Sequence, residues 1–536
     1  MRVRSAVAAA LLLAACGHTS QKPDPLPAEA HTLVAAQDQW ETSAGVVPAG
    51  TNAACPDGRM LVGAGGVAVD NDATAPGTYL MAGLEGGAPD DVTRQVNEAI
   101  AALAAERETS LRPENDNLIT LLPGGELLVV RLTYIDLSQP FALPLAFNGR
   151  SGARVGLVFL RSADCGQSWT ASLLDPARTA PGFGQGGAID RSGRYDVARV
   201  GACAFPDTVF QGGFDRPEVY VDPWSPADEP VVYVAANCDG RNPAVAGPLA
   251  NEAVVFRSGD GGRTWGNVAD GADVAVPVWA GPRYVPSMTV TGDRRLWLMW
   301  CDIDKHEPWV QVRDESGSWS PATQVFLGEP GKAAYPCIEA GGKLGTTAVR
   351  ETVPWGVAQT GDGVSMFYAG ILDPASGAPS DDATAGTQVL VTGRLAADGT
   401  KATLLGVVRP EELKTGAGPE KRSTLLPSLV EVAGSRDGRT DADVALLYWL
   451  EEAGGGLRPR YAELGDSLSA PRDLDPPVGT VRPVIAAATG YQAADYMKGA
   501  AAYAAPNEVV FVLAWPVPGQ DGTDVRYRVL TYRLVA

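Results

Sequence analysis

Acidic residues, tyrosines and arginines recur at or just before the short apolar segments of this chain, and their types could carry out chemistry. Carboxylates can donate or accept protons, a tyrosine can act as a nucleophile, and guanidinium groups bind carboxylates through paired N–H donors. The candidates for a central site are Asp116, Asp215, Arg216, Glu218, Arg283, Tyr284, Arg422, Asp495 and Tyr496.

Histidine chemistry is restricted, because the chain has only three histidines, His18, His31 and His306. A Ser-His-Asp mechanism would have to use His306, since the other two lie near the N-terminus. Metal sites built from several histidines are also disfavoured. We therefore expect no metal and no cofactor.

The elements that must position these residues are short β-strands. From about residue 115, apolar strands and Gly- or Asp-containing turns recur in six units of roughly four strands each. A single unit cannot bury both faces of its sheet, so neighbouring units must stack. The pattern predicts an all-β six-bladed β-propeller over residues 112–536. Five or seven blades are alternatives, because residues 31–111 could supply another.

Residues 31–111 are expected to form an N-terminal extension that contains one helix, at about 90–108. Val92, Val96, Ile100 and Leu103 share one face at helical spacing. Two aspartates at the start of this segment suit the positive end of a helix dipole. We expect the helix to pack against the propeller.

Two eight-residue segments fit the pattern S-x-D-x-G-x-[ST]-W, and each follows an apolar strand that ends in Arg. In such a turn the Asp carboxylate accepts hydrogen bonds from N–H and hydroxyl groups, Gly supplies a positive φ, and Trp buries apolar area. A degenerate copy spans Asp314 to Trp319. The residues that fit the pattern are Ser162, Asp164, Gly166, Ser168 and Trp169 in the first segment, and Ser258, Asp260, Gly262, Thr264 and Trp265 in the second.

This motif resembles the BNR or Asp-box repeat of sialidase-like β-propellers. The resemblance covers about residues 115–536 and implies that the motifs are structural elements at the blade periphery. It also implies a site with three arginines, a Tyr/Glu nucleophile pair and an Asp acid. In that family the three arginines clamp the carboxylate of an acidic sugar, and the first of them lies in an Arg-Ile-Pro element. This chain has Asn115-Asp116-Asn117-Leu118-Ile119 at the corresponding place, with Arg112-Pro113 a few residues earlier.

Two functions follow from these observations. The first is a non-catalytic surface propeller that binds a glycan or a surface protein, which requires only the fold and accounts for the missing arginine. The second is an exo-acting, sialidase-type glycoside hydrolase that cleaves terminal sugars from glycoconjugates. We favour the binding function and expect a monomer.

The N-terminal 16 residues predict a lipoprotein signal peptide. Basic Arg2 and Arg4 precede an apolar run that ends in Leu13-Ala14-Ala15-Cys16, which resembles a bacterial lipobox with Cys16 as the lipidated residue. An ordinary signal peptide with a chance cysteine is the alternative. Residues 17–30 are polar and Pro-rich, so they predict a flexible tether. We expect an exported protein that contacts the membrane only through this lipid. Gly17 rather than Asp follows the cysteine, and by resemblance to Gram-negative lipoproteins this favours the outer membrane over the inner one.

Six cysteines follow Cys16, and an even number in an exported chain permits up to three disulfides. The pairs nearest in sequence, Cys203–Cys238 and Cys301–Cys337, are the expected bridges, and buried free thiols are the alternative. The formal net charge of −20 excludes nucleic acid as a partner, because no basic surface is available to neutralise phosphates.

Overall fold

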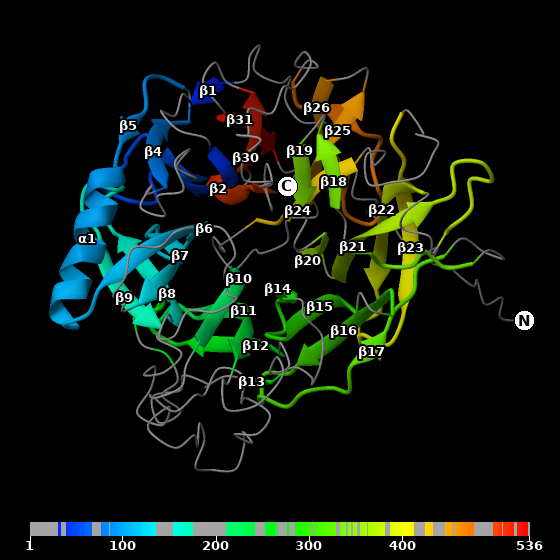
Figure 1. Cartoon of the computed structure of the whole chain (residues 1–536), viewed down its shortest axis with the longest axis horizontal. Helices are drawn as coiled ribbons and strands as arrows, with labels where there is room; N and C mark the ends of the chain where they lie inside the picture. The colour runs from blue at the N-terminus through cyan, green and yellow to red at the C-terminus, as the bar shows by residue number, and fades with distance from the viewer. Residues whose placement is uncertain are drawn as a thin grey trace, which may run out of the picture.

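The computed structural model shows an all-β ring of seven blades with one helix on its outer side (Figure 1). The described residues are 31–33, 39–66, 77–84, 86–135, 154–174, 211–241, 252–263, 265, 276–277, 285–302, 305–328, 333–338, 341–344, 347–350, 354–361, 363–380, 386–411, 424–432, 445–453, 456–475, 497–505, 508–518 and 523–533.

The first three blades each consist of four strands in sequence order, and a parallel strand pair joins blades 2 and 3 into one eight-stranded sheet. Blade 1 contains β2 (Gln39–Val47), β3 (Arg59–Gly66), β4 (Thr78–Gly83) and β5 (Asp90–Asp91). Blade 2 contains β6 (Leu111–Leu121), β7 (Leu127–Ile135), β8 (Arg154–Ser162) and β9 (Thr170–Leu174). Blade 3 contains β10 (Gln211–Val221), β11 (Val232–Arg241), β12 (Glu252–Ser258) and β13 (Val276–Pro277).

Blades 4 to 6 repeat the same four-stranded antiparallel order. Blade 4 contains β14 (Ser287–Val290), β15 (Leu296–Asp302), β16 (Glu307–Arg313) and β17 (Thr323–Gln324). Blade 5 contains β20 (Trp355–Thr360), β21 (Gly363–Leu372), β22 (Thr387–Leu395) and β23 (Ala402–Val408). Blade 6 contains β24 (Thr424–Val430), β25 (Ala445–Ala453), β26 (Gly456–Leu464) and β27 (Arg472–Asp473). A separate hairpin is formed by β18 (Gly341–Leu344) and β19 (Thr347–Arg350).

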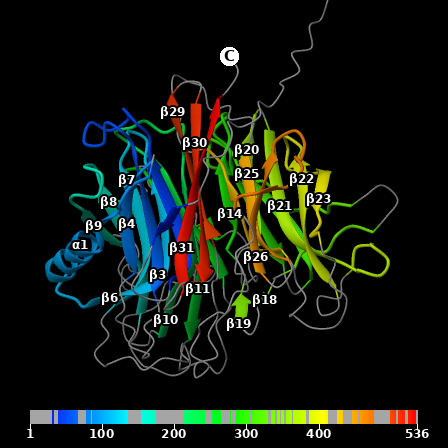
Figure 2. The same cartoon turned by 90° about the horizontal axis from the view of Figure 1, so that it is seen from above.

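Blade 7 closes the ring with strands from both ends of the chain (Figure 1), and its C-terminal strands lie side by side in Figure 2. Its order is β29 (Ala500–Ala505), β30 (Glu508–Pro518), β31 (Thr523–Arg533) and β1 (His31–Leu33), with β1 antiparallel to β31. The short strand β28 (Met497–Lys498) precedes this blade and pairs parallel to β2 of blade 1. The segment before blade 7 is therefore joined to blade 1 by the backbone pairing of β28 with β2.

The predicted count of six blades is wrong, and the ring has seven. The six repeat units expected from residue 115 onward correspond to blades 2 to 7, and the additional blade is β2 to β5. Those four strands lie within the segment that the sequence suggested as an extension. The alternative of seven blades, with this segment as the source of the extra one, is the arrangement observed.

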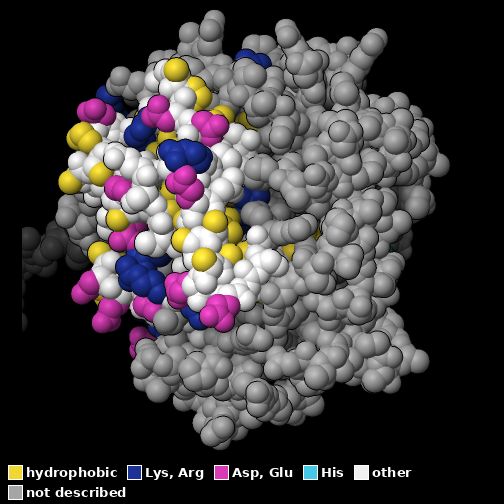
Figure 3. Space-filling view, turned by 60° about the vertical axis from the view of Figure 1, so that its left-hand side comes forward, with side chains coloured by type: hydrophobic (Ala, Val, Ile, Leu, Met, Phe, Trp, Pro, Cys, Tyr) yellow, Lys and Arg dark blue, Asp and Glu magenta, His cyan; other side chains and the backbone are white. Residues whose placement is uncertain are grey.

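The one helix of the described residues is α1 (Thr93–Glu106), which confirms the helix expected at about 90–108 with narrower bounds. Its buried residues are Val96, Ala99, Ile100 and Leu103, which pack in one cluster with apolar residues of blades 1 and 2. The predicted first residues Asp90 and Asp91 instead form β5, which pairs with β4. The face that carries α1 mixes acidic, basic and apolar side chains (Figure 3).

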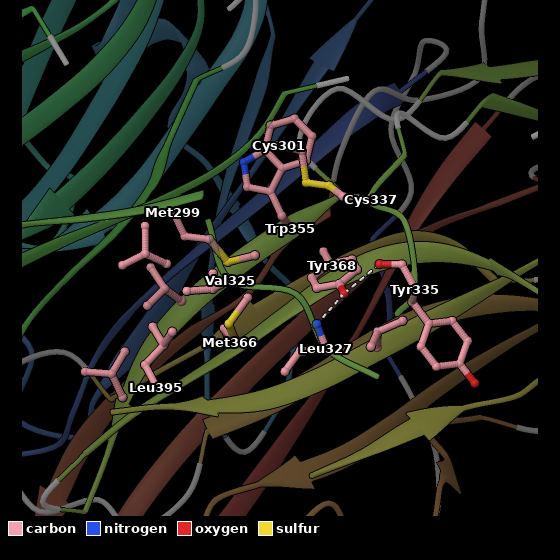
Figure 4. Packing of buried hydrophobic residues seen from close by; sticks show 14 of the residues in the cluster. Met299, Cys301, Val325, Leu327, Tyr335, Cys337, Trp355, Met366, Tyr368 and Leu395 are labelled. Carbon is pink, nitrogen blue, oxygen red and sulfur yellow. Dashed lines mark hydrogen bonds between the residues drawn. A yellow bond between two sulfur atoms is a disulfide. The ribbon is translucent and has the colours of Figure 1, made fainter. Parts of the chain in front are cut away.

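Apolar side chains fill the seams between blades, as the repeat pattern predicts. The seam between blades 4 and 5 is representative, because Met299 and Cys301 of β15 pack with Trp355 of β20 and Met366 of β21 (Figure 4). The Trp355 indole N–H donates to the Val285 carbonyl at 3.1 Å, so the polar atom of this fully buried ring is satisfied.

The first strands of the blades surround the axis of the ring, and neighbouring ones run parallel (Figure 1). Two hydrogen bonds fix this direction between β14 and β20. The Val357 N–H donates to Ser287 Oγ, and two residues later the Gln359 N–H donates to Thr289 Oγ1, each at 3.2 Å. Side chains from equivalent ends of different inner strands are thereby brought together at the axis.

Candidate functional site

The first motif turn connects β8 to β9 and is held by its own side chains. Asp164 accepts hydrogen bonds from the Ser168 N–H at 2.8 Å and from the Ser168 hydroxyl at 2.5 Å. Ser162 Oγ accepts from the Gly166 N–H at 2.7 Å, and Gly166 has a φ of +80°. Burial raises the pKa of Asp164, but hydrogen bonds from Ser168 and Ser162 outweigh it and hold this pKa below its usual range.

The second motif turn follows β12 and repeats this geometry. Ser258 Oγ accepts from the Gly262 N–H at 2.8 Å and donates to Asp260 at 2.7 Å. Gly262 has a φ of +84°, and the Trp265 indole donates to the Gly262 carbonyl at 3.2 Å. Trp169 makes the equivalent bond to the Gly166 carbonyl at 3.1 Å. Thr264 lies outside the described residues.

The degenerate copy also forms an Asp-centred turn, between β16 and β17 of blade 4. Asp314 accepts hydrogen bonds from the Ser316 hydroxyl at 2.6 Å and the Ser318 N–H at 2.9 Å. Gly317 takes a φ of +87°. All three turns therefore follow the third strand of a blade, and they lie at the rim of the ring rather than at its axis.

Each of the first two turns is attached to the preceding blade. Cys165 forms a disulfide with Cys55, which lies in the β2–β3 loop of blade 1, with 6.1 Å between the Cα atoms. In the second turn, the Asp260 carbonyl accepts a hydrogen bond from Arg161 of blade 2 at 3.0 Å. Arg161 also forms an ion pair with Glu126 of its own blade. The turns thus join blade 1 to blade 2 and blade 2 to blade 3.

At the axis, Glu431 joins the inner strands of four blades. It follows β24 of blade 6, and its Oε2 accepts from Thr289 Oγ1 of blade 4 and the Gln359 N–H of blade 5, each at 2.8 Å. The Tyr220 hydroxyl of blade 3 is hydrogen-bonded to the same carboxyl group. Glu431, Tyr220 and Gln359 each keep part of their surface accessible. We call these four residues the axial cluster, which consists of Tyr220, Thr289, Gln359 and Glu431.

The electrostatics of the axial cluster favour the uncharged form of its acid. Burial raises the pKa of Glu431 to about 7, although hydrogen bonds from Tyr220, Thr289 and Gln359 act to lower it. Burial and the adjacent Glu431 charge raise the pKa of Tyr220 well above its ordinary value. At neutral pH, Glu431 can therefore gain or lose a proton while Tyr220 remains a phenol.

An ion pair crosses the axis beside this cluster. Lys498 Nζ of β28 lies 2.7 Å from Glu218 Oε1 of β10, and the two side chains are 24% and 12% exposed. Glu218 and Tyr220 are two residues apart on the same strand, so their side chains point to the same side. The pair and the axial cluster are therefore neighbouring parts of one polar centre.

A backbone irregularity positions Glu218. The register of β10 against β11 shifts between Asp215 and Glu218, and Arg216 within this bulge has a φ of +51°. The same device occurs in blade 6, where the register of β24 shifts and Leu426, before Pro427, also has a φ of +51°. A positive φ is costly for a residue with a side chain, so the ring maintains strain at two inner strands.

The structure describes part of the predicted central site. Arg216 and Glu218 lie at the axis on β10, and Glu218 takes part in the polar centre. The backbone of Asp116 and Asp215 belongs to β6 and β10, but their side chains are not among those described. Arg283, Tyr284, Arg422, Asp495 and Tyr496 lie outside the described residues.

Sequence reasoning missed Tyr220, Gln359, Glu431 and Lys498. Tyr220 had a usable signal, because it follows Glu218 at the two-residue spacing of one strand face. Glu431 follows β24, and Lys498 is the last residue of β28. Their sequence neighbours do not indicate that Glu431 contacts Thr289, 142 positions away, or that Lys498 contacts Glu218, 280 positions away. Only the closure of the ring brings these residues together.

The predicted bridge Cys301–Cys337 is present, with 6.0 Å between the Cα atoms, and links blade 4 to the segment before blade 5 (Figure 4). The Cys55–Cys165 bridge was not predicted. Cys203 and the side chain of Cys238 lie outside the described residues, as does Cys16. Within the part of the chain that the structure describes, no group of three potential metal ligands occurs and no helix is long and apolar enough to cross a membrane.

Comparisons with known proteins return solved structures at low similarity. A protein of unknown function from Dyadobacter fermentans has a TM-score of 0.39 and 13% identity, over 78% of this chain and 94% of its own. A GH43_1 enzyme from Xanthomonas citri has a TM-score of 0.30 and 13% identity, over 70% of this chain and 94% of its own.

An α-L-arabinanase from Cellvibrio cellulosa has a TM-score of 0.27 and 11% identity, over 67% of this chain and 94% of its own. No family model matches the chain, and no curated protein matches its sequence. Similarity at this level carries no inference about activity. The chain is an all-β seven-bladed propeller with a polar centre on its axis.

Proposed function

We propose that this protein is a glycan-binding β-propeller whose ligand contacts the polar centre. The observation that carries the proposal is the convergence of Glu218, Lys498, Tyr220, Gln359 and Glu431 at the axis, each with accessible surface. A sugar hydroxyl both donates and accepts hydrogen bonds, and this set offers donors, acceptors and an aromatic ring. The motif turns resemble those of sialidase-like proteins, which supports a carbohydrate ligand by analogy.

A glycan array followed by calorimetry tests the binding function. The Tyr220→Phe and Lys498→Met variants remove polar atoms from the centre while keeping similar side-chain shapes, and each should weaken binding about tenfold, since one hydrogen bond to a charged or desolvated group contributes about 1–3 kcal/mol. Asp373→Asn, in an exposed turn of blade 5, is the control and should bind like the parent protein. Binding that survives both axial variants would place the ligand elsewhere, and capture of a surface protein instead of a glycan would reassign the partner.

A second candidate function is glycoside hydrolysis, and the Tyr220–Glu431 hydrogen bond favours it. In this reaction Glu431 takes the phenol proton while the Tyr220 oxygen forms a bond to the anomeric carbon. The bond from that carbon to the leaving oxygen breaks, and a carboxylic acid protonates the leaving group. In the second step the resulting carboxylate takes a proton from water as the water oxygen attacks the anomeric carbon. The bond to Tyr220 then breaks, and Glu431 returns the proton to the phenol oxygen. A pKa of about 7 suits a base that must work at neutral pH.

Fluorogenic glycosides, including a sialoside, separate the two functions. Hydrolysis predicts turnover that falls about 100-fold or more in Glu431→Gln and Tyr220→Phe, because each removes a proton-transfer partner, whereas Asp373→Asn keeps it. Sugar binding without turnover in the parent protein would exclude hydrolysis and leave the binding function.

We also propose that the protein is exported and attached to the outer membrane through lipid on Cys16. The lipobox-like segment supports this, and the disulfides Cys55–Cys165 and Cys301–Cys337 suit an oxidising compartment. Growth with radiolabelled palmitate should label the parent protein and not Cys16→Ala. Equal labelling of both would remove the basis for the anchor.

A further inference from the structure

We propose that the ligand of the polar centre is an uncharged sugar, and that the Glu218–Lys498 ion pair excludes sugars that carry a carboxylate. This inference rests on the proposed glycan-binding function and names its ligand class. It differs from the expectation that the resemblance to sialidase-like proteins raises, because their ligand is an acidic sugar held by arginines.

The ammonium group at the polar centre already has an anionic partner. Lys498 Nζ lies 2.7 Å from Glu218 Oε1, and Glu218 is only 12% exposed. A ligand carboxylate would have to draw Lys498 away from Glu218. That exchange would leave a largely buried carboxylate without its partner, and breaking such a pair is unfavourable.

An uncharged ligand does not require this exchange. The ammonium group has three N–H donors, and the bond to Glu218 occupies one of them. A sugar hydroxyl can accept from Lys498 and donate to the second oxygen of Glu218 while the ion pair stays intact. The pair then acts as one neutral donor–acceptor unit.

The axial cluster adds a second obstacle to an acidic ligand. Glu431 lies in contact with Tyr220, which shares a strand face with Glu218. A carboxylate placed at the centre would repel the ionised form of Glu431, because like charges repel strongly where solvent is limited. The phenol of Tyr220 and the amide of Gln359 offer hydrogen bonds without charge.

Matched sugars that differ only at C6 provide the test. Binding is measured by calorimetry at low salt for the methyl glycosides of glucose and galactose and for the corresponding uronates. Each neutral sugar should have a dissociation constant at least about tenfold lower than that of its uronate. Equal or tighter binding of the uronates would overturn this inference while leaving the binding function intact. Binding of none of these sugars, nor of any array glycan, would reject the proposed function itself.

Two variants test the role of the ion pair. Glu218→Gln frees Lys498 from its anion, so the preference for neutral sugars should fall about tenfold. Lys498→Gln leaves Glu218 unpaired and should increase that preference. Asp373→Asn should leave it unchanged. An unaltered ratio in both folded axial variants would contradict the assignment, and the comparison within the parent protein stands whether or not either variant folds.

Discussion

The rim and the axis of this ring join its blades by different means. At the rim, a covalent bond, apolar side chains and turns with satisfied hydrogen bonds connect neighbouring blades. At the axis, Glu431 and the Glu218–Lys498 pair connect distant blades through groups that titrate or carry charge. The rim is therefore suited to maintaining the fold, and the axis can respond to a ligand or to pH.

The two motif turns refine this comparison, because they share internal bonds and differ in their attachment. Cys165 has a φ of +58°, where the second turn has Gly261 with a φ of +72°. The first turn thus accepts a strained cysteine and gains a disulfide to blade 1. The second turn keeps glycine, and Arg161 of blade 2 lies against it.

The largest effect is expected at the rim tryptophans. Trp265 is 4% exposed, and its ring centroid lies 4.5 Å from that of Phe159 in blade 2. Trp265→Ala should lower the free energy of unfolding by about 3–5 kcal/mol through the cavity it leaves. Trp169→Ala should lower the free energy of unfolding by less than Trp265→Ala does when the disulfide is intact, because the Cys55–Cys165 bond still holds the first turn in place. Denaturant unfolding measures both, and a larger loss for Trp169→Ala would refute this ranking.

Next in size is the disulfide at the first turn. Replacing Cys55 and Cys165 by alanine should cost about 2–4 kcal/mol. The matched control is the Cys301–Cys337 pair, since these bridges close 110 and 36 residues respectively. On chain entropy the longer loop contributes about 1 kcal/mol more. Chemical denaturation of the two double variants measures the stability that each loses. A larger loss for the Cys301–Cys337 double variant would contradict this prediction and show that local packing outweighs loop length.

At the axis, stability should depend on pH through Glu431. Its pKa is about 7 in the fold against an ordinary value of 4.5, so the folded state binds this proton more tightly. The associated stabilisation is complete below pH 4.5 and disappears as pH rises through about 7, and a shift of this size corresponds to at most about 3 kcal/mol.

Glu431→Gln should therefore gain stability relative to the parent protein between pH 5 and pH 8, because glutamine cannot ionise. Thermal unfolding at a series of pH values measures this difference. Asp314→Asn, at the exposed third turn, provides a rim control without that trend. Parallel curves for the parent protein and Glu431→Gln would mean that Glu431 does not titrate in this range.

The smallest effect concerns the strained cysteine. In a Cys55→Ala background, Cys165→Gly should raise stability by about 0.5–1 kcal/mol, because glycine adopts a positive φ at little cost. Gly261→Ala should have the opposite sign, since a Cβ there would lie 2.9 Å from Pro230 and 3.0 Å from Arg161. Equilibrium unfolding of the two variants gives the comparison.

The sequence predicts local features of this fold well. Alternating apolar residues and Gly- or Asp-containing turns identify the strands of blades 2 to 7, and helical spacing identifies α1. Blade 1 is harder to recognise, because it lies very close to blade 2. A Cβ at Gly45 would collide with Ile119, and one at Gly63 would lie 2.6 Å from Asn117. The glycines that permit this contact also weaken the strand pattern.

The candidate site was predicted less completely, because it depends on contacts between distant blades. Glu218 could be found because it begins an apolar run in the sequence, although β10 itself begins earlier, at Gln211. Glu431 and Lys498 could not, since nothing in their local sequence indicates which blades they face. The number of blades decides those contacts, and the incorrect count of six would have paired different inner strands.

In blade 7 the pairing of β1 with β31 closes the ring, so the same arrangement of blades is compatible with a chain that is opened in another blade. A circular permutant that links β31 to β1 and opens in an exposed turn, such as the one at Asp373, would keep every inter-blade contact described above. Its closing strands would then lie in a different blade. Such a permutant could carry a fused domain at a chosen position around the rim while the axis stays intact.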